Sequence, residues 1–283
     1  MPNWTPFPFD AAGYIYAGAS LKENWNDLHL GDCEPYPDVD VVAVAASENA
    51  DALPDDFDGD CEALAALIRK AWRHYHCGEF MLAVETADQC GLLGHSVANK
   101  ATGVYASYLE DDEQVKQSLY QRAIERAESA MEALPGDPNA YYFHAFNLGR
   151  YSQSISIGKA LKQGLAGKVL NSLKTTIQLQ PRHAEAYTAL GLYHAEIIDK
   201  VGKLIGSMTY GASAETALGH FQAALSITPQ APIAHIEYGN GLYMLYADKR
   251  LDEVTDAYIA ASEMTARYAM EKLDIDFAHS ELE

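Results

Sequence analysis

A glycine- and lysine-rich stretch at residues 154–173, SISIGKALKQGLAGKVLNSL, has a composition suited to binding phosphate. Its tripeptide Ala166-Gly167-Lys168 resembles the end of a phosphate-binding P-loop. That pattern, G-x-x-x-x-G-K-[ST], also requires a glycine five residues before Gly167 and a hydroxyl residue after the lysine, where this chain has Lys162 and Val169. A P-loop follows a buried strand, whereas this stretch follows a predicted helix. The spacing therefore argues against a nucleotide site, and we expect the glycines to serve the geometry of a helical hairpin.

Two further groups of residues could bind metal ions, but their spacing fits poorly. His74 and His76 flank a tyrosine just before a cysteine, and side chains two residues apart on a helix point to different faces. The acidic run 55–60 (DDFDGD) has its glycine too early for a calcium loop and lacks the closing glutamate. We interpret it as the start of a helix, with Asp60 as the N-cap. No nucleophile-elbow, zinc-protease or catalytic-cysteine signature is present, so we expect neither an enzyme nor a cofactor or metal.

Positive charge gathers in a window that contains no acid. Residues 138–184 include no Asp or Glu, whereas the average of the chain predicts about seven in these 47 residues. The basic side chains of the window are Arg150, Lys159, Lys162, Lys168, Lys174 and Arg182. Either they form a binding face for an anionic partner, or acids of neighbouring helices or of the N-terminal segment neutralise them. With Tyr151 and Tyr187 they form the predicted partner-binding set.

Composition limits the class of protein. The chain has 283 residues, of which 48% are hydrophobic, enough for a sizeable core. Its 40 acids and 20 bases give a net charge of −20, which argues against nucleic acid as a partner. No run of about 18 apolar residues predicts membrane insertion, and the N-terminus has no secretory pattern. Four cysteines without a CxxC pair favour a cytoplasmic location.

The chain divides into a proline- and aromatic-rich segment and a helical remainder. Residues 1–60 hold more than half of the eleven prolines, and we expect an extended arm with one short regular element at 39–46. From Cys61 onward the pattern predicts one helix after another. Three segments end alike, with small or apolar residues followed by a proline: 123–140, 169–186 and 217–234. Such repetition indicates stacked helical hairpins.

These segments resemble the tetratricopeptide repeat (TPR). AEAYTALGLYHAE and PIAHIEYGNGLYM match the first helix of that repeat, and Gly191 and Gly239 would let two helices approach closely. The prolines lie 46 and 48 residues apart, against 34 in a standard repeat. The surplus contains the dipeptides Gly158-Lys159 and Gly202-Lys203.

Elongated hairpins of this kind resemble two groups of TPR proteins. One is the bacterial subunit associated with TRAP-type transporters, and the other is the eukaryotic regulator of microtubule dynamics family. The residues that carry the resemblance are NLGRYSQSISIGKALKQGLAGKVLNSL, LGLYHAEIIDKVGKLIGSMTYGAS and ALGHFQAALSIT. The transporter-associated proteins carry an export signal, which this sequence does not show.

The sequence therefore predicts an all-α, TPR-like right-handed superhelix of about five elongated hairpins at residues 61–283, preceded by an arm at 1–60. The resemblance implies a non-catalytic binding or scaffold protein that recognises a protein partner, or a small anionic ligand, on a basic and aromatic concave face. The alternative is a structural subunit of a homo- or hetero-oligomer, in which the acidic arm of one chain docks on the basic hairpin of another.

Overall fold

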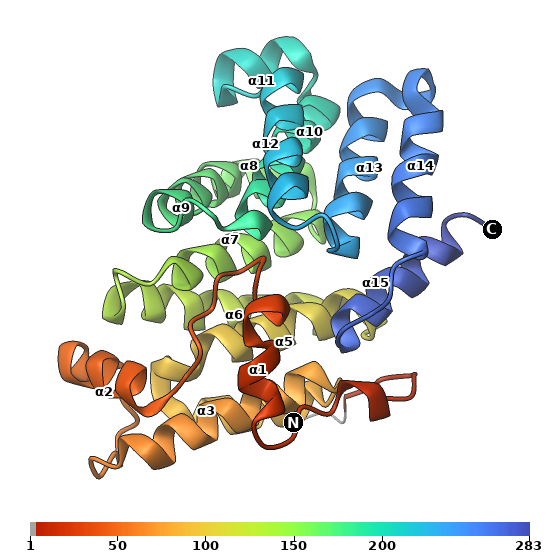
Figure 1. The fold of residues 1–283 in the computed structure, drawn as a ribbon. Helices are drawn as coiled ribbons and strands as arrows, with labels where there is room; N and C mark the ends of the chain where they lie inside the picture. Colours follow the sequence, from red (N-terminus) through yellow and green to blue (C-terminus); the bar gives the residue numbers. More distant parts are fainter. Residues whose placement is uncertain (1–3) are drawn as a thin grey trace. The chain divides into compact units, whose positions relative to one another are not determined.

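The structure is a computed structural model that describes residues 4–283, and every regular element in that range is helical (Figure 1). The prediction of an all-α fold is confirmed. The chain forms two compact units: unit 1 comprises Met1–Asp27 and Glu34–Ser172, and unit 2 comprises Leu28–Cys33 and Leu173–Glu283. Within residues 4–283, none of the helices has the length and hydropathy needed to cross a membrane.

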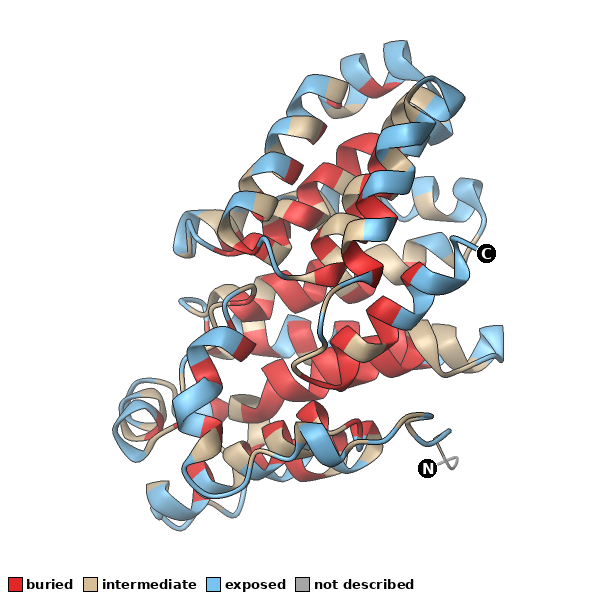
Figure 2. Cartoon of the chain, turned by 45° about the vertical axis from the view of Figure 1, so that its right-hand side comes forward, coloured by how far each residue is buried: buried red, intermediate tan, exposed pale blue. Residues whose placement is uncertain are grey.

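Unit 1 consists of consecutive helices that pack on one another. They are α1 (Ser20–Leu28), α2 (Val39–Glu48), α3 (Cys61–His76), α4 (Phe80–Ala87), α5 (His95–Tyr108), α6 (Glu113–Ala133), α7 (Pro138–Gln153), α8 (Ile157–Lys162) and α9 (Leu165–Leu179), the last of which continues into unit 2. Helix α3 packs on α4, α5 on α4 and α6, and α6 on α7. The helices are buried on the sides that face their neighbours (Figure 2). Large side chains such as Trp72, Tyr105 and Phe143 are fully enclosed and form the core.

Aspartates begin four of these helices, the first of which is α2, capped by Asp38. The Asp60 carboxylate accepts a hydrogen bond from the Ala63 amide at 2.9 Å, which confirms the predicted N-cap of α3. Asp112 caps α6 and Asp137 caps α7 in the same way, and Pro138 occupies the first position of α7. A carboxylate at this position satisfies amides that have no partner within the helix, and proline loses nothing there.

The N-terminal segment contains more helix than the prediction of an extended arm with one regular element at 39–46 allowed. It contains two α-helices, α1 and α2, and only α2 coincides with the expected regular element. Helix α1 buries Leu21 and Trp25, which are four residues apart and lie on one helical face. The surrounding prolines and aromatic residues obscure this short apolar period in the sequence. The division into an arm at 1–60 and a helical domain at 61–283 stays a prediction.

Aromatic side chains and arginines fasten the N-terminal segment within unit 1. Trp4 stacks on Tyr105 with ring centroids 4.0 Å apart. Trp25 meets the edge of Trp72 at 5.8 Å, and its indole N–H donates to the Glu34 carbonyl at 2.7 Å. Arg73 Nε donates to the Tyr16 carbonyl at 2.8 Å. The aromatics of the segment are thus used in packing within unit 1.

Unit 2 repeats the pattern of elongated hairpins. Its helices are α10 (Ala184–Val201), α11 (Lys203–Tyr210), α12 (Ala214–Ile227), α13 (Pro232–Tyr246), α14 (Leu251–Ser262) and α15 (Ala269–Ser280). Helix α10 packs on α12 and α13, and α13 on α14. Residues 28–33 belong to this unit. Within it, the Gly31 carbonyl accepts a hydrogen bond from the Glu185 amide at 3.1 Å, at the start of α10.

Candidate basic partner-binding face

The glycine- and lysine-rich stretch forms the short helix α8 and the beginning of α9. Ser156 caps α8 by accepting a hydrogen bond from the Lys159 amide at 3.3 Å. Gly164 separates the two helices with φ +64°, a conformation that other residues rarely adopt. Gly158 and Gly167 have ordinary helical positions with open space around them. The expectation that the glycines serve hairpin geometry therefore holds for Gly164 alone.

Three lysines of this stretch are presented to solvent. Lys159, Lys162 and Lys168 are exposed, and of the described residues no carboxylate forms an ion pair with any of them. On α8 two apolar side chains, Ile157 and Leu161, are 50% and 47% exposed. We call the side chains of Ile157, Lys159, Leu161, Lys162 and Lys168 the basic face. It combines ammonium groups with uncovered apolar surface.

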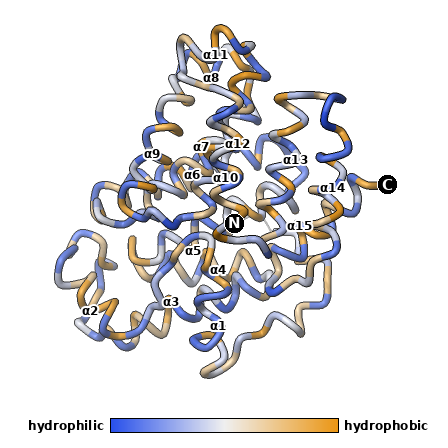
Figure 3. Tube along the Cα trace, turned by 45° about the horizontal axis from the view of Figure 1, so that its top comes forward, coloured by the Kyte–Doolittle hydropathy of each residue, from blue (hydrophilic) through white to orange (hydrophobic). Residues whose placement is uncertain are grey.

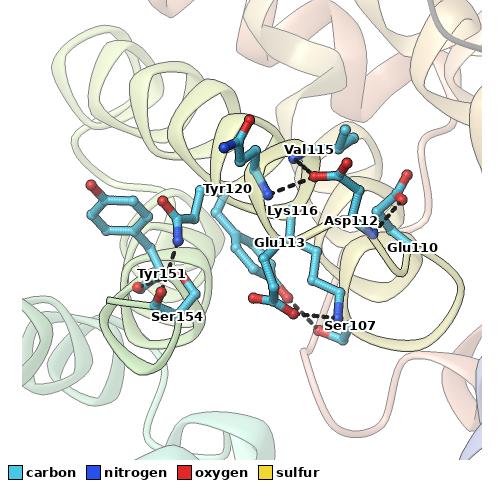
Figure 4. Close-up of polar contacts among 11 residues, drawn as sticks. Ser107, Glu110, Asp112, Glu113, Val115, Lys116, Tyr120, Tyr151 and Ser154 are labelled. Carbon is cyan, nitrogen blue, oxygen red and sulfur yellow. Dashed lines mark hydrogen bonds and ion pairs between the residues drawn. The ribbon is translucent and has the colours of Figure 1, made fainter. Parts of the chain in front are cut away.

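Side chains of α6 and α7 contact Lys159 and the residues that precede α8. The Lys159 ammonium lies 5.7 Å from the centroid of the Tyr151 ring, within the range of a cation–π contact. Gln121 of α6 donates its amide to the Tyr151 hydroxyl at 3.1 Å. The Ser154 hydroxyl donates to the Tyr151 carbonyl at 2.8 Å (Figure 4). Gln117, also of α6, donates to the Ser154 carbonyl at 2.8 Å and so fixes the point at which α7 ends. Tyr151 is buried, so its ring contacts the Lys159 ammonium from the interior of unit 1.

Arg150 lies on the same helix as Tyr151 but is only partly exposed. Its guanidinium is 5.9 Å from the centroid of the Phe146 ring, and Nη1 donates to Gln153 Oε1 at 3.3 Å. It is engaged within α7 and is a less accessible member of the predicted set than the lysines of α8.

The other three predicted residues belong to unit 2 and are described with it. Lys174 of α9 and Arg182 are exposed, and the Arg182 carbonyl accepts a weak hydrogen bond from the Cys33 thiol at 3.5 Å. Tyr187 of α10 is half-buried, with its ring centroid 5.9 Å from that of His220. The eight residues of the predicted set are thus divided, with five in unit 1 and three in unit 2.

The positive charge of Lys168 affects His144, a histidine in the interior of unit 1. Burial lowers the pKa of His144; Glu128 opposes that shift, and Lys168 adds to it. His144 Nδ1 lies 2.8 Å from the Ser172 hydroxyl in the interior of unit 1. Burial is thus the main cause of this shift, and the charge of Lys168 adds a smaller part to it.

The basic face offers charged and apolar groups that can bind a ligand. Ammonium groups bind carboxylates, and the exposed Ile157 and Leu161 can cover apolar side chains of a ligand. The sequence reasoning missed these two apolar residues, although their spacing of four is the signal of one helical face. Of the described residues, no group of three His, Cys, Asp or Glu is arranged to hold a metal ion. His74 instead pairs with Glu79 at 2.5 Å, and His76 stacks on Trp72.

Comparison with known proteins agrees with this helical organisation. The family model described as regulator of microtubule dynamics protein 1-3 matches residues 79–245, from the turn before α4 to the last turn of α13. No curated protein matches the chain. The matched range includes the basic face and more than half of the 283 residues. A family of regulators favours a role in protein interaction. The chain belongs to the regulator of microtubule dynamics protein 1-3 family.

Proposed function

We propose that this chain is a non-catalytic, TPR-like binding protein that recognises an acidic protein segment on its basic face. The observation that carries the proposal is the exposure of Lys159, Lys162 and Lys168 beside Ile157 and Leu161, without an ion-paired carboxylate among the described residues. In a chain of net charge −20, these three exposed lysines form a local region of positive charge that can bind an acidic group.

The family match supports a regulatory role exerted through binding. The family is named for the regulation of microtubule dynamics, a role that can be exerted through contacts between proteins. The helical hairpins support a TPR-like superhelix, because consecutive helices join through turns at the predicted prolines and Gly191 lies against the neighbouring hairpin helix. The free thiols of Cys33, Cys61, Cys77 and Cys90 suit a cytoplasmic location.

The occupant of the face is an acidic segment with apolar side chains. Ammonium groups alone would suit any anion, including a small ligand, but the uncovered Ile157 and Leu161 add a requirement for apolar contact. An amphipathic peptide with Asp or Glu beside Val, Leu or Ile satisfies both requirements.

Selection from a random peptide display library tests this proposal. The wild-type chain should enrich peptides that combine acidic and aliphatic residues, because both features of the face select for them. The variant Lys159→Glu, Lys162→Glu, Lys168→Glu should lose that enrichment. Replacement of the same lysines by arginine keeps the charge and should keep the enrichment. Equal peptide preferences for the wild type and the glutamate variant would refute the proposed role.

A further inference from the structure

Helix α2 carries the chemical complement of the basic face on the same chain. Its exposed apolar side chains are Val39, Val41 and Val44, the last of which is 56% exposed. Asp40 precedes Val44 by one helical turn and Glu48 follows it by one turn, so that acidic and apolar groups share a face. Only Val42 of this helix is buried, toward the α3 side of unit 1. In Figure 3 the helix carries both hydrophobic and hydrophilic positions.

The charge around α2 mirrors that around α8. Residues 38–60 contain eight acids and neither Lys nor Arg, whereas residues 138–184 contain six Lys or Arg and no acid. Asp38 does pair with Lys22 at 3.6 Å, but that bond is at the start of the helix and leaves the valines uncovered. Each segment therefore lacks the counter-charge that the other supplies.

The two surfaces do not cover each other within one molecule. Val41 and Val44 of α2, and Ile157 and Leu161 of α8, are all exposed in unit 1. Figures 1 and 3 both show α2 and α8 apart, with α6 and α7 between them. Packing on α3 fixes α2 in that place. A partner with the chemistry of α2 must therefore come from a second molecule.

We infer that α2 of one copy docks on the basic face of a second copy. This inference rests on the proposed function, because it names the acidic, aliphatic segment that the face recognises. The valines of α2 would cover Ile157 and Leu161, while Asp40 and Glu48 would approach Lys159 and Lys162. The two patches are different surfaces of one chain, so the contact is heterologous and joins copies head to tail. Association then continues beyond two chains unless the rotation closes a ring.

Sedimentation velocity of the full chain tests the inference, over roughly 1 to 300 µM to include weak, transient contacts. We expect the weight-average mass of the wild type to rise with concentration beyond that of two chains. In about 0.5 M salt the rise should be much smaller, because charges are screened over a few ångströms. A wild type that stays monomeric over this range would overturn the inference.

Two variants each remove one side of the contact. The α8 variant is Ile157→Asn with Leu161→Asn, and the α2 variant is Val41→Asn with Val44→Asn. Each should remain monomeric alone. An equimolar mixture should form particles of two chains and nothing larger, because only the intact α2 of one variant can dock on the intact α8 of the other. A mixture that stays monomeric, or variants that associate like the wild type, would overturn the inference.

Controls separate this contact from other causes. Leu204→Asn on α11 removes an apolar side chain that is 74% exposed and lies outside both patches, so it should leave association unchanged. Circular dichroism verifies the fold, and Lys159→Glu with Lys162→Glu replaces the α8 variant if that one unfolds. A monomeric wild type that still enriches acidic peptides overturns the inference and leaves the proposed function intact. If the wild type is monomeric and also fails to enrich acidic peptides, both the inference and the proposed function are wrong.

Discussion

Gly191 of α10 lies directly against the ring of Phe221 of α12: a methyl group added at position 191 would come within 2.7 Å of that ring. Phe221 is fully buried and also lies against Gly241 of α13, where an added methyl group would come within 2.4 Å. The ring thus occupies a space that exists because two helices carry glycine at the contact. This relationship sets the packing of the hairpin in unit 2.

Gly191→Ala should therefore destabilise the chain. The ring cannot move away without meeting α13, so we expect a loss of about 1 to 3 kcal/mol in the free energy of unfolding, as for other overpacked sites. Gly219→Ala is the matched control, because Gly219 lies in α12 with no atom within 4 Å of an added methyl group. That change should stabilise the helix by about 0.5 to 1 kcal/mol. Urea unfolding measures both, and equal midpoints for the two variants would contradict the packing described.

Trp25 should be essential to the attachment of the N-terminal segment. Its side chain is 2% exposed, lies against Trp72 and donates to the Glu34 carbonyl. Trp25→Ala should cost about 3 to 5 kcal/mol of unfolding free energy, because it leaves a large cavity. Ile15→Ala, at a position in the same segment that is 66% exposed, should cost little. Limited proteolysis should cut the Trp25 variant first within residues 4–60, and equal resistance of the two variants would speak against this attachment.

His194 should make stability depend on pH. Burial lowers the pKa of His194 to about 4, and His220 and Lys174 act in the same direction. The ordinary pKa of histidine is about 6.5, so between about pH 6.5 and 4 the unfolded chain binds a proton here that the folded chain does not. The stabilising contribution is therefore complete above pH 6.5 and is lost as the pH falls toward 4.

A substitution at His194 isolates this effect from that of other groups. His194 stacks on His220 with ring centroids 5.7 Å apart, and phenylalanine can keep that stacking without titrating. His194→Phe should lose less unfolding free energy than the wild type when the pH is lowered from 7 to 5. His279→Gln, at an exposed position of α15, should behave as the wild type does. Parallel pH curves for His194→Phe and the wild type would exclude this role.

The sequence predicted those parts of the fold that local chemistry decides. Asp60 begins α3, and Pro135, Pro181 and Pro229 follow the ends of α6, α9 and α12, because capping and the missing N–H of proline act within a few residues. Helix α1 was missed because the apolar period of Leu21 and Trp25 is brief and becomes stable only through contact with α3.

The candidate site could be predicted only in part. The lysines could be identified because a window without Asp or Glu can be recognised from the order of residues alone. Exposure, however, is decided by neighbouring helices, so the burial of Tyr151 and the uncovered state of Leu161 could not be read from composition. For the same reason the division of the basic residues between two units was not apparent.

Direct binding of a defined acidic peptide tests the central claim, that the basic face is a recognition surface. The probe is a fluorescent peptide with the sequence of residues 38–48, DVDVVAVAASE, measured by anisotropy against the full chain in low and high salt. Reversal of three charges at Lys159, Lys162 and Lys168 to glutamate should weaken binding by about 10- to 100-fold in low salt, at roughly 0.5 to 1 kcal/mol per exposed pair. The arginine variant should bind as the wild type does. Equal affinity of the wild type and the glutamate variant in low salt would contradict the account.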